Sequence, residues 1–184
     1  MDRETGRIQR IASGDRTAFE ELFHAYKRRL LGYVYRMTGD ASRTEEITSD
    51  VLVEVWKSAA RFQGRSPVST WIFGIAHHKV IDELRRRRGQ GVQVEVPNDL
   101  VDPGPSPEGE AIRQDRSVRL RETLQQLTAE HREVLELTFF QGRSVEEIAG
   151  ILRCPANTVK TRMFYARKKL RELLDSTELR ENPL

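Results

Sequence analysis

The chain has 184 residues, of which 38% are hydrophobic and 32% are charged, and its net charge is +3. No apolar run approaches the ~20 residues of a membrane span, and no apolar stretch follows the N-terminal methionine, so neither membrane insertion nor a secretory signal is expected. The single cysteine, Cys154, excludes an internal disulfide and a multi-cysteine metal site. We therefore expect a cytoplasmic protein of one or two domains, with no metal and no cofactor.

Three amphipathic helices are predicted in the first half of the chain. Apolar residues recur at i, i+3, i+4 and i+7 from Phe19 onward, which predicts a helix over residues 17–37. The same period predicts helices over residues 44–59 and 68–88, on either side of a loop at residues 62–67. Because no segment of useful length alternates with the period of a strand, the predicted fold class is all-α.

An acidic segment then separates two basic parts of the chain. The net charge is +5 up to Arg88, −5 over residues 89–110 and +3 in the remainder. The acidic segment also holds eight glycines and prolines, which interrupt regular structure. We therefore predict a flexible acidic linker over residues 91–111, between one helical domain over residues 1–90 and a second over residues 112–184.

Helices over about residues 110–127 and 130–140 are expected to open the second domain, and a helix-turn-helix follows them. Ser144 begins a capping box, in which its side chain accepts a hydrogen bond from the backbone N–H of Glu147 and the Glu147 carboxylate reaches back. The motif is completed by a short helix over residues 145–152, a turn at Arg153 and Cys154, and Pro155 at the first position of the next helix.

The second helix of this motif has two chemically different sides. At about 100° per residue, one side holds apolar residues, namely Val159, Met163, Ala166, Leu170, Leu173 and Leu174. The other side holds cations, a hydroxyl group and rings, namely Lys160, Thr161, Phe164, Tyr165, Lys168 and Arg171. Residues 156–171 include six basic residues and no acidic one, which favours contact with a polyanion such as the DNA major groove. The alternative is a basic surface helix without a ligand.

A second cationic segment ends the helix predicted over residues 68–88. The four consecutive arginines from Arg85 to Arg88 exceed what the helix dipole requires, which favours a phosphate contact over dipole compensation alone. Upstream of them lie side chains that can stack on unpaired bases and hold them, namely Trp71, Phe73, His77, His78 and Lys79. The alternative for Trp71 is a place in the core.

With these motifs in order, the chain resembles a bacterial RNA polymerase sigma factor of the extracytoplasmic-function (ECF) group in the sigma-70 family. Residues 39–56 resemble the segment that docks on the clamp helices of RNA polymerase, and residues 62–87 resemble the segment that melts and reads the −10 element. Residues 127–135 are similar to the start of the −35 domain, and residues 146–162 are similar to its helix-turn-helix. The resemblance covers about residues 15–175.

The resemblance implies three sets of contact residues. Core polymerase would be bound by Ile47, Asp50, Val51, Glu54, Val55 and Trp56. The unpaired −10 strand would be bound by Phe62, Gln63, Ser69, Trp71, His77, His78, Lys79, Arg85 and Arg86. The −35 duplex would be bound by Asn157, Thr158, Lys160, Thr161, Arg162, Phe164, Tyr165 and Lys168.

The implied function is a transcription initiation factor that directs core RNA polymerase to promoters. The implied partners are the clamp helices and the flap of the large polymerase subunits, promoter DNA and an anti-sigma factor. The alternative is a stand-alone helix-turn-helix regulator that binds a palindromic operator without polymerase. An enzyme is not expected, because the sequence shows no nucleophile–base pair, metal-ligand cluster or glycine-rich phosphate loop.

Overall fold

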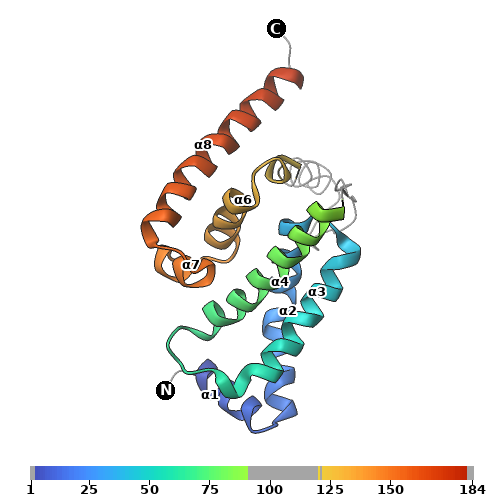
Figure 1. Ribbon diagram of the computed structural model, residues 1–184, viewed down its shortest axis with the longest axis vertical. Helices are drawn as coiled ribbons and strands as arrows, with labels where there is room; N and C mark the ends of the chain where they lie inside the picture. The colour runs from blue at the N-terminus through green and yellow to red at the C-terminus, as the bar shows by residue number, and fades with distance from the viewer. Residues whose placement is uncertain (1–2, 91–119, 121, 182–184) are drawn as a thin grey trace, which may run out of the picture.

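The computed structural model describes residues 3–90, 120 and 122–181, and all regular structure in these residues is helical. The elements are α1 (Arg3–Ala12), α2 (Arg16–Thr38), α3 (Ala41–Ser58), the 3-10 turn η1 (Ala59–Arg61), α4 (Val68–Gln90), α6 (Ala129–Leu135), the π-helix η2 (Glu136–Phe140), α7 (Val145–Leu152) and α8 (Ala156–Glu181) (Figure 1). The all-α fold class and the three helices predicted in the first half are confirmed.

Two sequence predictions fall wholly or mainly outside the described residues. The acidic linker over residues 91–111 lies outside them, as does most of the helix predicted over residues 110–127. Of that helix, residues 120 and 122–127 are described; residues 120 and 122–125 are helical, and residues 126 and 127 form a turn.

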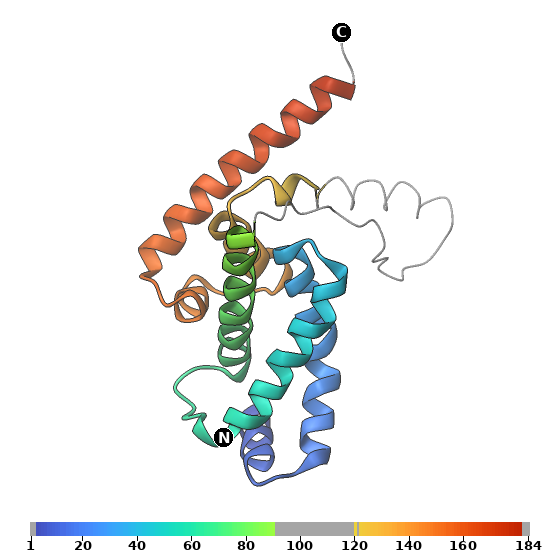
Figure 2. The same ribbon diagram turned by 45° about the vertical axis from the view of Figure 1, so that its right-hand side comes forward.

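The first four helices form a bundle in which α2, α3 and α4 lie side by side (Figures 1 and 2). Aspartate caps begin two of them: the Asp15 carboxylate accepts a hydrogen bond from the Ala18 N–H at 3.0 Å, and Asp40 accepts one from the Arg43 N–H at 3.0 Å. Gly39, with φ at 67°, gives α2 a left-handed C-cap, so the chain turns directly into α3.

Helix α1 is an element that the sequence analysis missed. Its Ile8 and Ile11 are buried in the bundle, and the Tyr26 hydroxyl on α2 donates a hydrogen bond to Glu4 Oε1 at 2.8 Å. Two isoleucines three residues apart are the apolar signal of this otherwise polar segment, and that signal is too short to establish a helical period.

A buried ion network joins the α2–α3 corner to the end of α4. Glu83 is 5% exposed and accepts hydrogen bonds from Arg87 Nε at 2.8 Å, Arg86 Nε at 3.1 Å and an Arg43 guanidinium nitrogen at 3.1 Å. Arg87, itself buried, also donates to the Asp40 carboxylate. Arg87 therefore joins α4 to the α2–α3 corner, so the phosphate contact expected of the four-arginine run cannot include Arg87 in this arrangement.

The helix-turn-helix forms over the predicted residues. The Ser144 hydroxyl accepts a hydrogen bond from the Glu147 N–H at 3.2 Å, and the Ser144 N–H donates to the Glu147 carboxylate at 2.9 Å. Arg153 makes the turn in the left-handed conformation, with φ at 50°. Pro155 lies immediately before α8 rather than at its first position, and its carbonyl accepts a hydrogen bond from the Thr158 N–H at 2.9 Å.

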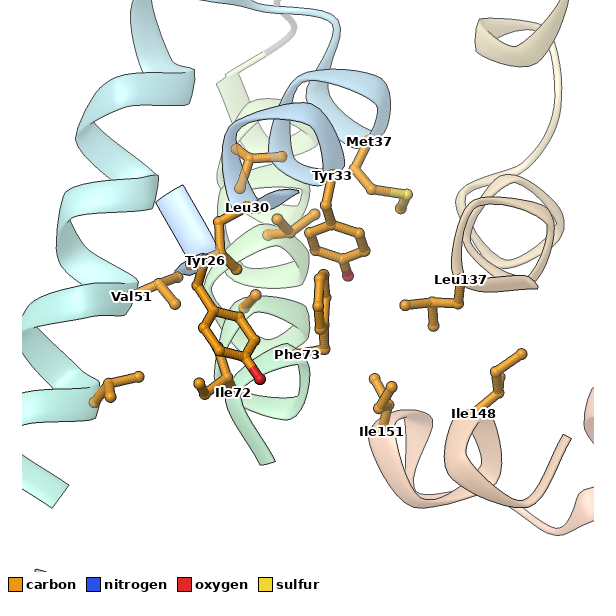
Figure 3. Packing of buried hydrophobic residues seen from close by; sticks show 14 of the residues in the cluster. Tyr26, Leu30, Tyr33, Met37, Val51, Ile72, Phe73, Leu137, Ile148 and Ile151 are labelled. Atoms are coloured by element: carbon orange, nitrogen blue, oxygen red, sulfur yellow. The ribbon is translucent and has the colours of Figure 1, made fainter. Parts of the chain in front are cut away.

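The C-terminal helices pack directly on the N-terminal bundle. Helix α4 lies between the α2–α3 pair and α7 (Figure 2). Tyr33 and Phe73 from the bundle face Leu137, Ile148 and Ile151 from the C-terminal helices in one apolar cluster (Figure 3). Phe73 is fully buried, with its ring edge-to-face against Tyr33 at 5.4 Å, so the expectation that it stacks on bases is wrong.

The network around Glu83 makes a testable prediction about stability. Replacing Glu83 with glutamine leaves three guanidinium groups around a neutral side chain, so the free energy of unfolding should fall by about 3 kcal/mol at pH 7. The matched control is Glu46→Gln, because Glu46 also pairs with Arg43 but is 56% exposed. That variant should lose under about 1 kcal/mol in the same urea titration.

The effect should also depend on pH. Burial raises the pKa of Glu83, but hydrogen bonds from Arg86, Arg87 and Arg43 outweigh it and lower the pKa from 4.5 to about 2. The stabilisation is therefore complete above pH 4.5 and is lost as the pH falls towards about 2. The difference between the unaltered chain and Glu83→Gln should shrink over that range, and a constant difference would contradict the network.

Candidate nucleic-acid and polymerase interfaces

One side of α8 faces solvent, as its helical wheel predicts. Most of the residues predicted to contact the −35 element are exposed, namely Asn157, Lys160, Thr161, Phe164, Tyr165 and Lys168. The other two, Thr158 and Arg162, are half-buried. On the opposite side, Val159, Met163 and Ala166 are buried in the core. Helix α8 lies at the outer edge of the molecule in both views (Figures 1 and 2), so this side is free to meet a large partner.

Two neighbouring rings are the most unusual feature of this side of α8. Phe164 is 65% exposed and Tyr165 is 52% exposed, and their rings meet edge-to-face at 5.3 Å. Exposed aromatic side chains that adjoin each other often mark a contact surface. The Thr161 hydroxyl donates to the Asn157 carbonyl at 2.9 Å, which leaves the hydroxyl oxygen able to accept a hydrogen bond from a base or a backbone group.

The residues predicted for the −10 strand divide by exposure. The exposed ones are Gln63, His78, Arg85 and Arg86, and the half-buried ones are Phe62, Trp71, His77 and Lys79. The rings of Phe62 and Trp71 lie 5.0 Å apart beside the loop before α4, so Trp71 belongs to an aromatic pair at the surface of the bundle. Although His78 is exposed, partial desolvation of its ring, followed by the charge of Arg153, lowers the pKa of His78 below its ordinary value.

Ser69 and His77 are covered by the C-terminal helices. Ser69 is 5% exposed, and its hydroxyl accepts a hydrogen bond from Arg143 at 2.6 Å. His77 Nδ1 lies 2.7 Å from Glu133 Oε1. In this arrangement both side chains face protein, so a contact between them and a DNA strand requires the two helical groups to separate.

The four-arginine run at the end of α4 is also divided. Arg86 donates to Glu83 through two of its nitrogens, although its side chain is 48% exposed. Arg85 and Arg88 are exposed. The cations of this run that are not engaged with Glu83 are therefore Arg85 and Arg88.

The structure corrects half of the set predicted to contact polymerase. Ile47, Val51 and Val55 are 5%, 0% and 0% exposed, because their i, i+4, i+8 spacing forms the stripe that fixes α3 to the bundle. Asp50 is exposed and Glu54 is half-buried. Asp50 and Glu54, rather than the three buried aliphatic side chains, are therefore available to a partner.

Sequence analysis missed a groove beside these carboxylates. Phe19, Phe23, Val53 and Trp56 line an apolar groove of about 640 Å³ between α2 and α3. The rings of Phe19 and Trp56 meet edge-to-face at 5.1 Å, and Val53 is 48% exposed. The sequence did contain a signal for this groove. Val53 lies three residues after Asp50, so the two side chains share the outward side of the helix.

The described residues also bear on metal binding and on membrane insertion. Nowhere in residues 3–90, 120 and 122–181 do three His, Cys, Asp or Glu side chains gather in a group that could hold a metal ion. None of the helices in these residues is both long enough and apolar enough to cross a membrane.

Comparison with known proteins connects these surfaces to a family. Residues 22–90 match the family model Sigma-70 region 2, and residues 117–170 match Sigma-70, region 4. The ECF RNA polymerase sigma factor SigK of Mycobacterium tuberculosis is 31% identical over 171 residues, which are 91% of each chain. The chain belongs to the ECF sigma factors. Another relative, the RNA polymerase sigma-H factor of Pseudomonas aeruginosa, is 29% identical over 176 residues, again 91% of each chain.

Two solved structures resemble this sigma factor over most of its length. CnrH, in complex with the cytosolic domain of CnrY, superposes with a TM-score of 0.73 at 25% identity and covers 95% of this chain and 99% of CnrH. RpoE of Bartonella quintana, in complex with the anti-sigma factor NepR, superposes with a TM-score of 0.69 at 26% identity and covers 85% of this chain and 96% of that one. As a member of this family, the chain is a transcription initiation factor that directs RNA polymerase to promoters.

Proposed function

We propose that this sigma factor binds core RNA polymerase with the outward side of α3, the −35 duplex with the outward side of α8, and the unpaired −10 strand with α4 and the loop before it. The observation that carries the proposal is the single sign of charge on the N-terminal part of α8, residues 156–171. Its exposed Lys160, Lys168 and Arg171 adjoin two exposed rings, and no acidic residue lies within residues 156–171. A helix with such a surface, second in a helix-turn-helix, suits the major groove.

The position of each residue along α8 suggests its role. In a helix-turn-helix the N-terminal residues of the recognition helix reach base edges, so we assign base contacts to Asn157, Lys160 and Thr161. Phe164 lies one turn further on, where a ring can meet a thymine methyl group. Lys168 lies two turns beyond Lys160 on the same side, and we assign it to a backbone phosphate.

The −10 contacts would combine stacking with charge. The Phe62–Trp71 pair provides aromatic surface for an unpaired base, and the exposed Gln63 beside it can donate to and accept from a base edge. Lys79 and Arg85 follow on α4 and would track the strand's phosphates. This assignment needs no contribution from Phe73, which is buried.

The polymerase contact would join charge to an apolar anchor. Asp50 and Glu54 are four residues apart on α3, and Val53 lies between them at the mouth of the apolar groove. A partner helix with basic residues and one protruding apolar side chain would satisfy both features. We assign this role to the clamp helices of the polymerase, and place the flap contact on the C-terminal helices.

An anti-sigma factor is the remaining proposed partner. CnrH was solved with CnrY, and RpoE with the anti-sigma factor NepR, and both share the fold of this chain over most of its length. We propose that a protein of this kind holds the sigma factor inactive in the cytoplasm until a signal releases it.

The assignment of Lys168 predicts a change in salt dependence. With core polymerase present, Lys168→Ala should lower the slope of log affinity against log salt concentration by about one, because one fewer counterion is released. Lys169→Ala is the matched control, since Lys169 already pairs with Glu172 at 3.3 Å. Equal slopes for the unaltered chain and Lys168→Ala would remove Lys168 from the phosphate contacts.

The polymerase surface predicts a loss of binding without a loss of fold. Asp50→Ala combined with Glu54→Ala should weaken the affinity for core polymerase at least tenfold in a fluorescence titration, with an unchanged unfolding transition. Glu45→Ala is the control, because Glu45 is exposed on the same helix but lies about 140° around it from Asp50. If both sets of variants bind equally well, this side of α3 is not the docking surface.

Run-off transcription with core polymerase on genomic fragments tests the whole proposal. We expect defined start sites when this protein is added, each preceded by a shared pair of −35 and −10 sequences. A protein that starts no transcription but binds a palindromic site tightly by itself would instead be a stand-alone regulator.

A further inference from the structure

Two adjacent rings occupy the outward side of α8, and one of them lies at its centre. Viewed down the helix at about 100° per residue, Phe164 lies about 20° from Asn157 and about 40° from Lys168. Its side chain is 65% exposed, and that of Tyr165 beside it is 52% exposed. Phe164 therefore faces whatever this side of α8 binds, whereas the neighbouring Met163 is buried on the opposite side.

Tyr165 supports the ring of Phe164. The two rings meet edge-to-face, with centroids 5.3 Å apart and planes at 82°, which is an arrangement that aromatic pairs prefer. Tyr165 also lines a groove with Thr128 and His131 at the beginning of α6, so protein lies beside its ring as well. A ring that is supported in this way loses little conformational freedom when it binds a partner.

The neighbours of Phe164 along the helix place its ring inside a groove. Lys160 precedes Phe164 by one turn and Lys168 follows it by one turn, each about 6 Å away along the helix axis, and both are exposed. Lys160 is assigned to a base edge and Lys168 to a phosphate. The ring therefore lies between a contact on the floor of the major groove and a contact on its wall.

The floor of the major groove offers one apolar group to such a ring. Paired bases present their edges there and keep their faces stacked, so the ring cannot stack on them. All four bases present hydrogen-bonding groups in the major groove, but thymine adds its 5-methyl group. Covering a donor or acceptor with an apolar ring removes its water without replacing the hydrogen bond, which is unfavourable. The group that best suits Phe164 is therefore a methyl group on a pyrimidine.

We infer that Phe164, supported by Tyr165, recognises the 5-methyl group of a pyrimidine in the −35 element, whether that pyrimidine is thymine or 5-methylcytosine. The latter carries the same methyl group at the same ring atom and pairs with guanine. Cytosine methylation at this position therefore strengthens promoter binding by this sigma factor. The inference rests on the proposed function, because it takes the outward side of α8 to lie in the −35 major groove, and it adds the chemical group that is recognised there.

Replacement of thymine by uracil tests the inference, because the two bases differ only by the methyl group. A promoter fragment found by run-off transcription is rebuilt with each −35 thymine replaced in turn, and the affinity of the holoenzyme is measured by fluorescence anisotropy. At one position uracil should lower the affinity about fourfold, as expected for the loss of one buried methyl group. No loss at any position, or a −35 element without an A·T pair, would overturn the inference.

A matched pair of variants connects the methyl group to the ring. Phe164→Ala should bind the thymine and uracil fragments equally, because it lacks the ring that covers the methyl group. Tyr165→Phe is the control, since it keeps both rings and should retain the difference of about fourfold. Because Phe164 is exposed, its replacement should leave the unfolding transition unchanged. A difference that persists in Phe164→Ala would assign the methyl group to another residue and overturn the inference.

Methylated cytosine provides a test in the opposite direction. At the position sensitive to uracil, a fragment with a C·G pair is compared with one that carries 5-methylcytosine in the same pair. Methylation should raise the affinity of the unaltered holoenzyme about fourfold and leave that of Phe164→Ala unchanged. Equal affinities of the unaltered holoenzyme for the two fragments would overturn the inference.

Failure of this inference differs from failure of the proposed function. If transcription starts but uracil has no effect, the proposed function stands and the inference is wrong. If no fragment supports transcription and the protein alone binds a palindromic duplex, the proposed function is wrong, and the same uracil comparison on that duplex decides whether Phe164 recognises a methyl group. A protein that binds no duplex in either form overturns both.

Discussion

The burial of two carboxylates, Glu133 and Glu136, is the constraint on which the arrangement of the molecule depends. Both are carried by the C-terminal helices and are bound by Tyr33, His77 and Arg36 of the N-terminal bundle, while Gln141 also donates to Glu136 at 3.0 Å. A buried carboxylate without a partner is strongly unfavourable, so these two residues restrict how the helical groups can dock while they remain in contact. The neighbouring Arg132, whose pKa burial lowers to about 10, strengthens this fit by donating to the Met37 carbonyl at 2.6 Å.

Because of this docking, the three proposed interfaces differ in their exposure to solvent. The docking side of α3 and the outward side of α8 are exposed in this arrangement, whereas α4 is partly covered. The protein would therefore bind polymerase and the −35 duplex first. It would bind the −10 strand only after the two helical groups separate. Such an order would suit an initiation factor, because an unpaired strand becomes available only after the duplex has been opened.

How much the sequence predicts depends on whether local or long-range contacts decide a feature. The α7–α8 motif follows from Ser144, Glu147 and a helical wheel, all of which are local signals. Phe73 and His77 were both expected to face DNA, yet their surroundings are set by residues 60 or so positions away, such as Glu133 and Leu137. One helix period cannot reveal which of two apolar sides meets a distant segment. For the same reason Val51, in the middle of a docking motif, proved to be core.

The most direct test of the account is a footprint of one promoter fragment by the sigma factor with and without core polymerase. We expect the protein alone to protect neither element. The C-terminal helices cover part of α4, and the −35 surface on α8 binds DNA without support from any other surface. With core polymerase, both the −35 and −10 elements should be protected, with permanganate-reactive thymines at the −10 element. Tight, polymerase-independent protection of a palindromic site would contradict the account.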